Sequence, residues 1–441
     1  MSRERDRIAR QREKNAVVEC NLIQKKFYPE LFSRFEEVKD PRHQSYITYS
    51  CKEMLGTLYY KGIAGISSMQ RMTREFNREA VVGNLYQFME GKAKEYLPHG
   101  VTENEFLAKL DPNELEMIQK DIVYQMIRRK TFDDAKVSGH WQVLVDATEL
   151  DEGYEQKNDN YLSRTYHRGE ENEITKYHRG VLEAKIYFGN NLVCSIATET
   201  IENSEEYQNK KMTEDSIKQD CERKAFVRLA EKLKKRFPRL PVCIVADGLY
   251  VNHTVIEICK EKNWKYIIRY KEGCASSIEK EYQAIPEKQI SGKAEYVNGV
   301  IFGDDEVNVL KYAETKIKKG EEVTTKFAWI TNFEITAKNA EKLVRAGRRR
   351  WKIENQGFNR QKNWQGDIGH ACSWNERAQK NHYLMEQVSD FIKQLYEYFY
   401  LKKNEIKKAQ KNISSDLLAS FAQQLTREDI LKCDMQGISN N

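Results

Sequence analysis

Hydrophobic residues recur every three or four positions through the first 137 residues, and this spacing predicts helices. It is clearest in CKEMLGTLYYKG (51–62) and PNELEMIQKDIVYQMIRRKTF (112–132). Asp111 and Pro112 suit the N-cap and the first position of the second of these helices. We therefore expect residues 1–137 to form a mostly α-helical N-terminal domain.

The pattern changes at His140, where short apolar runs replace the helical spacing. WQVLVDATEL (141–150) predicts a strand that ends at Asp146. Two β-rich runs, 181–188 and 192–201, flank a Gly-Asn-Asn turn that is typical of a hairpin. An amphipathic helix (213–237), a buried strand ending at Asp247, a helix (252–263) and a strand (265–270) follow.

This order of strands and helices is that of an RNase H-like α/β fold. The helical crossover makes the strand ending at Asp247 parallel to an earlier strand, and in this fold its neighbour is the first strand. Asp146 and Asp247 are therefore expected at neighbouring strand ends, on one edge of the sheet.

Alternating residues from about Gly273 to Ala328 predict a β-rich insertion, after which helical spacing resumes. The last forty residues are polar, and we expect them to be peripheral. The expected segments are a helical N-terminal domain (1–137), the first part of the RNase H-like core (138–272), the β-rich insertion (273–328), the second part of the core with the Glu354 helix (329–400) and a C-terminal tail (401–441).

Composition excludes some classes of protein and leaves a local charge cluster to explain. No run of about 18 apolar residues exists, so no membrane span is expected, and the N-terminus lacks the apolar region of a secretory signal. The nine cysteines form no C-x-x-C pair, which favours reduced thiols in the cytoplasm. Net charge is only +6, yet six cations and a single carboxylate, Glu354, lie between Arg348 and Trp364.

Asp146, Asp247 and Glu354 are the candidate metal ligands. Each Asp follows an apolar run and precedes a small residue, and Mg²⁺ prefers such oxygen ligands. The alternative is that each Asp only caps a turn at the end of its strand. Glu354 likewise has two interpretations, because Arg350 lies four residues before it and an ordinary helical ion pair would use the same spacing.

VLVDATEL (143–150), CIVADGLYVN (243–252) and GRRRWKIENQGFN (347–359) resemble the three catalytic blocks of DDE transposases of the bacterial insertion-sequence-4 type. The resemblance implies that Asp146, Asp247 and Glu354 hold two Mg²⁺ ions, for which Mn²⁺ could substitute. It implies metal-dependent cleavage of transposon ends and transfer of the 3′-hydroxyl to target DNA. The cations expected to bind DNA are Arg348, Arg349, Arg350, Arg360 and Lys362.

The same resemblance implies the partners and the location. These are double-stranded DNA (terminal inverted repeats and target), a homodimer in the synaptic complex, and the nucleoid in the bacterial cytoplasm. The helical N-terminal domain would bind the DNA ends. Two other hypotheses remain open: an RNase H-like nuclease without transposition, and a domesticated or inactive relative that only binds DNA.

The family's Tyr-Arg-Glu-Lys signature is matched in part. Arg350 and Glu354 fit, but Gly347 stands at the Tyr position and Gln361 at the Lys position. Lys362 and Arg360 are the two candidates to replace that Lys.

The remaining expectations concern one segment and three aromatic residues. Residues 163–180 are expected to be a loop, either facing DNA or mobile, and Trp329 a core residue or a wedge for a flipped base. Trp351 and Phe358 are expected to pack their helix onto the sheet.

Overall fold

The computed structural model describes residues 15–43, 45, 47–203, 221–271, 275–318, 321–425 and 429. The chain forms two compact units. We call Met1–Lys130, Glu149–His178 and Phe358–Asn441 the helical unit, and Thr131–Thr148 with Arg179–Gly357 the sheet unit. These boundaries differ from the expected segments, because the helical unit takes chain from both ends of the sequence.

The helical unit confirms the predicted helices of the N-terminal region. Asp111 is the N-cap of α8, where its side chain accepts the Asn113 N–H, and Pro112 is the first helical residue. The described elements that lie wholly in this unit are α2 (Ala16–Phe27), α3 (Leu31–Glu36), α4 (Cys51–Ile63), α5 (Met69–Phe76), α6 (Glu79–Phe88), α7 (Gly100–Lys109), α8 (Pro112–Arg128), β2 (Leu162–Tyr166), α14 (Asn359–Asn363), α15 (Glu376–Tyr396), the π-helix η8 (Glu397–Lys402) and α16 (Gln410–Phe421).

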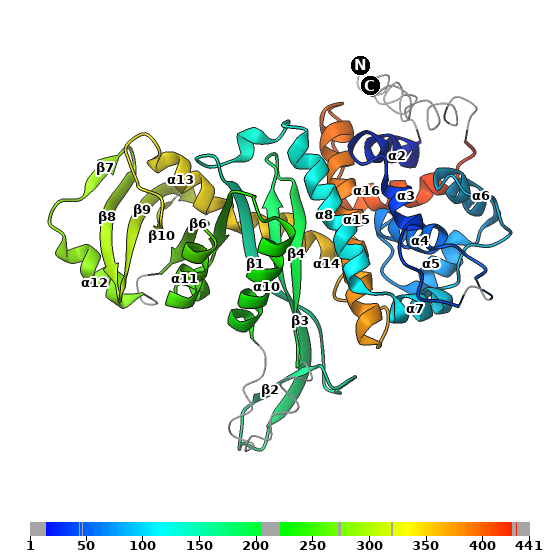
Figure 1. The fold of residues 1–441 in the computed structure, drawn as a ribbon, viewed down its shortest axis with the longest axis horizontal. Coiled ribbons are helices and arrows are strands. Elements are labelled where there is room, and N and C mark those ends of the chain that lie inside the picture. Colours follow the sequence, from blue (N-terminus) through cyan, green and yellow to red (C-terminus); the bar gives the residue numbers. More distant parts are fainter. Residues whose placement is uncertain are drawn as a thin grey trace. The chain divides into compact units, whose positions relative to one another are not determined.

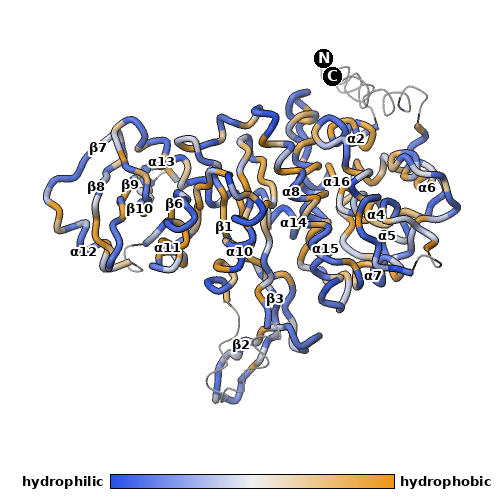
Figure 2. The backbone as a smooth tube through the Cα atoms, in the orientation of Figure 1, coloured by the Kyte–Doolittle hydropathy of each residue, from blue (hydrophilic) through white to orange (hydrophobic). Residues whose placement is uncertain are grey.

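Helix α15 lies at the centre of the helical unit and contacts α2, α4, α7 and α8. Helix α16 shows that the expectation of a peripheral tail is wrong for the described residues, because Ile413, Leu417 and Phe421 are buried. These residues recur every four positions, which gives an otherwise polar segment one apolar face. Figure 2 shows hydrophobic stretches in orange along α2 and α16. The first fourteen residues, and most residues beyond 425, lie outside the described ranges.

A mixed sheet organises the sheet unit: β3, β1, β5, β6, β10, β9, β8 and β7 are neighbours in that order, and β4 pairs with β3 off this path (Figure 1). Its elements are η2 (Asp133–Ala135), β1 (Trp141–Gly153), β3 (Ile174–Tyr187), β4 (Val193–Ile201), α10 (Glu222–Arg236), β5 (Val242–Ala246), η4 (Gly248–Tyr250), α11 (His253–Glu261), β6 (Lys265–Tyr270), α12 (Ser276–Ala284), β7 (Gln289–Ser291), β8 (Ala294–Phe302), β9 (Asp305–Lys318), β10 (Glu321–Thr331), α13 (Ala340–Gly347), the 3₁₀-helix η6 (Arg348–Trp351) and the π-helix η7 (Ile353–Phe358). Residues 213–220 of the predicted helix before β5 lie outside the described ranges.

The predicted RNase H-like order is confirmed. β3 and β4 form an antiparallel hairpin, and α10 carries the chain over to β5, which pairs in parallel with both β1 and β6. The hairpin turn has Gly189, Asn190 and Asn191 at positive φ, the backbone conformation that these residue types tolerate best. The crossover therefore places the fifth strand beside the first, as the sequence predicts.

The β-rich insertion extends the same sheet. β10 pairs along its whole length with β9, and its last four residues also pair with β6. Two strand predictions need correction. β1 continues past Asp146 to Gly153, and part of the expected loop 163–180 is instead β2 paired with the start of β3.

Membrane-spanning helices and disulfide bonds are considered for the described residues. None of the helices that the structure describes has the length and apolar character needed to span a membrane. No disulfide bond joins any of the seven cysteines in the described ranges.

Candidate active site

Asp146 and Asp247 lie side by side because of the register between β1 and β5. The paired residues run from Trp141 opposite Val242 to Leu144 opposite Val245. Each Asp comes two residues after the last of these pairs, so both lie at one edge, where the β1–β5 pairing ends although β1 itself continues to Gly153. Asp247 is also the N-cap of η4, where it accepts the Leu249 N–H at 3.0 Å. The capping interpretation therefore holds for Asp247 without removing it from the shared edge.

Arg350 joins Asp146 to Glu354. Its Nη1 lies 2.9 Å from Asp146 Oδ2, and its Nη2 lies 2.8 Å from Glu354 Oε1. The i,i+4 ion pair that the sequence allowed is therefore real. The same guanidinium also binds a second carboxylate, that of Asp146, which lies 204 residues earlier in the chain. The structure thus brings together Asp146, Asp247, Arg350 and Glu354.

The site concentrates negative charge in a partly buried place. Burial raises the pKa of Asp146 to about 7, Arg350 opposes this rise, and the carboxylates of Glu354, Asp247 and Glu222 add to it. A desolvated carboxylate beside other carboxylates is stabilised in its charged form by a nearby cation. Arg350 is that cation in this structure.

The side chains have the chemistry of a divalent metal site, but the structure does not gather them as one. The donors are hard carboxylate oxygens, which Mg²⁺ and Mn²⁺ favour. In the part of the chain that the structure describes, no three acidic, histidine or cysteine side chains are gathered as metal ligands. Since Arg350 lies between Asp146 and Glu354, a metal ion shared by these two carboxylates would compete with the guanidinium for the same oxygens.

Gly347, at the signature's Tyr position, is explained by Trp329. A Cβ added to Gly347 would lie 2.5 Å from the indole nitrogen of Trp329, so no larger side chain fits there without movement. Trp329 is fully buried and stacks on Phe327, with ring centroids 5.7 Å apart. The prediction of a core Trp329 is confirmed by this burial.

Arg348 and Arg349 each contact groups of the sheet unit. Arg348 Nη1 lies 2.9 Å from Glu314 Oε2, and the Arg348 guanidinium is 4.9 Å from the Phe327 ring centroid. Arg349 lies over the Tyr187 ring at 4.8 Å, and burial lowers the pKa of Arg349. Both remain half-buried, so their predicted contact with DNA stays a prediction.

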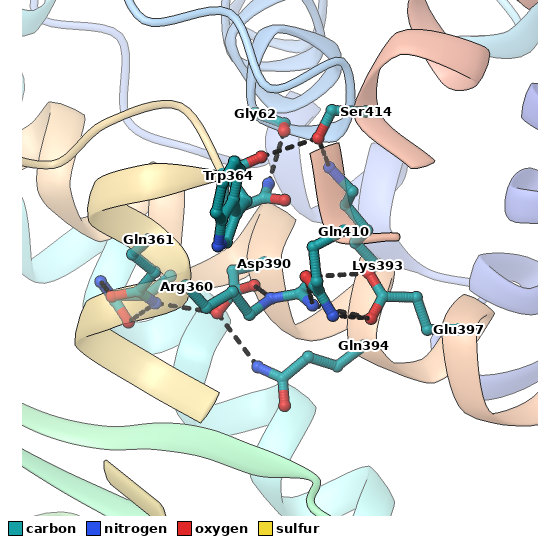
Figure 3. A network of polar contacts seen from close by, with 12 residues as sticks. Gly62, Arg360, Gln361, Trp364, Asp390, Lys393, Gln394, Glu397, Gln410 and Ser414 are labelled. Atoms are coloured by element: carbon teal, nitrogen blue, oxygen red, sulfur yellow. Dashed lines mark hydrogen bonds and ion pairs between the residues drawn. The ribbon is translucent and has the colours of Figure 1, made fainter. Parts of the chain in front are cut away.

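Arg360 is a core residue of the helical unit, and the expectation that it lies on a DNA-facing surface is wrong. Its side chain is 3% exposed. Its Nε lies 2.5 Å from Asp390 Oδ1, and its two terminal nitrogens each lie 2.7 Å from an oxygen of Glu397 (Figure 3). Nη1 also donates to Gln410 Oε1 at 2.6 Å, so two carboxylates and an amide already bind the groups that would face a phosphate.

Gln361, at the signature's Lys position, is also buried. Its amide nitrogen donates to Asp390 at 2.8 Å and to Gln387 at 2.9 Å (Figure 3). Lys362 is half-buried, and Trp351 is 44% exposed, so the expected packing of Trp351 onto the sheet is wrong. Phe358 is buried, as predicted.

Glu222 and Tyr250 were missed by the sequence analysis. The Tyr250 hydroxyl donates to Glu222 Oε1 at 2.5 Å, and Tyr250 belongs to the η4 turn that Asp247 caps. Glu222 carried no motif signal, because only the folded crossover brings the start of α10 to η4. An acidic residue in the first turn of that crossover helix was the one available hint.

Part of the chain is similar to a known protein family. Residues 218–385 match the family model described as "Transposase DDE domain", a span that contains Asp247 and Glu354 but begins after Asp146. No curated protein matches the chain. Among solved structures, the chain is similar to the piggyBac transposase in a synaptic complex with hairpin DNA, at 11% identity and a TM-score of 0.41, over 93% of this chain and 80% of that one.

Proposed function

We propose that the chain is a DDE transposase, as the match of residues 218–385 to that domain supports, and that it mobilises a bacterial insertion sequence of the insertion-sequence-4 type. It would cut the ends of its element and join the freed 3′-hydroxyls to target DNA. The observation that carries the proposal is the meeting of Asp146 with Asp247 through the β1–β5 register, beside Arg350 and Glu354.

Enzymes of this class act on DNA with divalent metal ions. We propose two Mg²⁺ ions, replaceable by Mn²⁺, with Asp146, Asp247 and Glu354 as their protein ligands. When bound, two such ions would supply Lewis-acid chemistry, activating the attacking oxygen and stabilising the leaving oxygen of a phosphodiester. The chain's own part is to hold the two Asp carboxylates on neighbouring strands, which are rigid elements of the fold.

Arg350 has a second anion available once DNA is present. A guanidinium binds a phosphate with two parallel hydrogen bonds, as it binds carboxylates. We expect Arg350 to leave Asp146 and Glu354 for a DNA phosphate as the metal ions bind. Arg348 and Arg349 would neutralise neighbouring phosphates, which position DNA without reading its sequence.

Lys362 is our candidate for the signature's Lys. The π-helix η7 includes Glu354, and i→i+5 hydrogen bonding places about one more residue in that turn than an α-helix does. In the helix that follows, the residue two turns beyond Glu354 is therefore 362 and not 361. The burial of Gln361 in the helical unit agrees with this shift.

Double-stranded DNA is the proposed partner, both as terminal inverted repeats and as target. Two ends must be held together during transposition, so we propose a homodimer in the synaptic complex, at the nucleoid of a bacterial cell. The helical unit, which contains most of the N-terminal helices, is the proposed part that binds the ends.

A strand-transfer assay tests the proposal. The full chain is mixed with Mg²⁺, a target plasmid and a duplex whose exposed 3′-hydroxyl ends in the inverted repeat found in the DNA flanking the gene. We expect covalent joining of that end to the plasmid, lost on chelation of the metal. Hydrolysis without joining would instead indicate a nuclease, and binding without nicking would indicate an inactive DNA-binding relative.

A further inference from the structure

Glu222 lies beside the active site without being part of the predicted triad. It is the first residue of α10, and it is half-buried. Tyr250 is fully buried, and its hydroxyl donates to Glu222 Oε1 at 2.5 Å. A hydrogen bond to a charged acceptor contributes more than one between neutral groups. This contact therefore fixes the position of Tyr250 against the start of α10.

Tyr250 belongs to the same short turn as Asp247. Asp247 caps η4, and the Tyr250 N–H donates back to the Asp247 carbonyl at 3.2 Å. One turn along α10 from Glu222, Phe226 meets the Tyr250 ring edge-on, with centroids 5.3 Å apart. The turn that carries Asp247 is thus attached to α10 at two points, one polar and one aromatic.

Glu222 is also near enough to the catalytic carboxylates to interact with them electrostatically. Burial raises the pKa of Glu222, the Tyr250 hydrogen bond opposes this, and Asp247 adds to it. Two roles are therefore conceivable for a fourth carboxylate: it holds Asp247 through Tyr250, or it adds negative charge for a cation. The direct hydrogen bond and the shared turn favour the first.

We propose that Glu222 is a positioning residue that sets the Asp247 carboxylate by fixing Tyr250 and the η4 turn. The inference rests on the proposed function, since it assumes that Asp247 holds a divalent ion. Groups that orient a metal ligand from behind contribute about 10- to 100-fold to metal affinity. Loss of the Glu222–Tyr250 contact should lower metal affinity on that scale.

The test is Mn²⁺ affinity of the full chain, measured by the electron paramagnetic resonance signal of free Mn²⁺. We expect Glu222→Ala and Tyr250→Phe each to weaken binding about 10-fold. Glu222→Gln keeps an amide oxygen that accepts the Tyr250 hydroxyl, so it should stay within about twofold of the wild type. Glu257→Ala, an exposed carboxylate on α11, is the matched control.

Two outcomes would overturn the inference. If Glu222→Gln weakens binding as much as Glu222→Ala while Tyr250→Phe binds normally, the charge matters and the hydrogen bond does not. Tyr250→Phe keeps the aromatic packing on Phe226. If this variant binds Mn²⁺ as the wild type does, the η4 turn does not need the hydrogen bond between Tyr250 and Glu222. Asp247→Asn distinguishes a failure of the Glu222 inference from a failure of the proposed function. Unchanged Mn²⁺ affinity in that variant would refute the proposed function itself. In its background, Glu222→Ala should cost nothing further.

Discussion

Replacing Asp146 by Asn is expected to abolish Mg²⁺-dependent strand cleavage while leaving binding to DNA ends largely intact. Asn keeps the shape of the side chain and one oxygen, but it removes the charge that a divalent ion requires. The loss should be about 10³-fold in cleavage rate, the upper end of the range for removing one charge-stabilising group from an active site. Cleavage is measured on labelled duplex, and end binding by an electrophoretic mobility shift.

The control for this variant is Glu257→Gln, which neutralises an exposed carboxylate of the same sheet unit. It should cleave at the wild-type rate. Cleavage retained by Asp146→Asn would remove Asp146 from the site, even though β1 and β5 place it beside Asp247. Loss of DNA binding together with cleavage would show that Asp146 acts elsewhere than in the chemical step.

Arg360→Ala is expected to destabilise the helical unit by about 3–5 kcal/mol, the usual cost of removing one partner from a buried ion pair. Asp390 would lose its cation in a position that is 1% exposed, and Glu397 would lose both of its contacts with the guanidinium. Native-state hydrogen exchange of the α15 amides measures the local free energy of opening in this unit.

Lys362→Ala is the matched control, two residues further along α14 and half-buried. It should change the opening free energy of α15 by no more than about 0.5 kcal/mol, because Lys362 is only half-buried whereas Arg360 is enclosed. If Lys362 contacts a phosphate, the same variant should weaken DNA binding and reduce its salt dependence. An α15 left unchanged by Arg360→Ala would contradict the structural role of Arg360.

The fold of the RNase H-like core was predictable because each of its elements is specified by residues that are neighbours in the sequence. Apolar runs of strand length, a Gly-Asn-Asn turn and a helical crossover are each read from a few neighbouring residues, and handedness rules then limit the topology. The neighbourhood of β1 and β5 follows from this order. The pairing of Asp146 with Asp247 needed only the register, in which both follow the paired residues by the same two positions.

The helix that carries Glu354 was predicted less well, because its geometry depends on contacts from distant parts of the chain. The sequence from 340 to 363 forms four helical segments of three types, including the π-helix at Ile353–Phe358. Uniform α-helical spacing therefore misplaced Arg360, although it placed Phe358 correctly. Arg360 looked like a surface cation because its partners, Asp390 and Glu397, come 30 and 37 residues later.

The reason for a glycine at position 347 also could not be predicted from neighbouring residues. Its lack of a side chain looked like the loss of the signature Tyr, and only the folded structure shows that Trp329, from β10, fills that space. Glu222 is a further case, since its link to Asp247 passes through Tyr250. Residues whose roles depend on a partner in another element were thus the ones that sequence patterns did not find.

The central claim is that Asp146, Asp247 and Glu354 together hold the divalent metal ions of a transposase. Its most direct test is Mn²⁺ binding by the full chain, compared among the wild type, Asp146→Asn, Asp247→Asn, Glu354→Gln and the Glu257→Gln control. The account predicts that each of the three active-site variants binds Mn²⁺ at least about 10-fold more weakly, while the control is unchanged. Wild-type affinity in all three variants would contradict it.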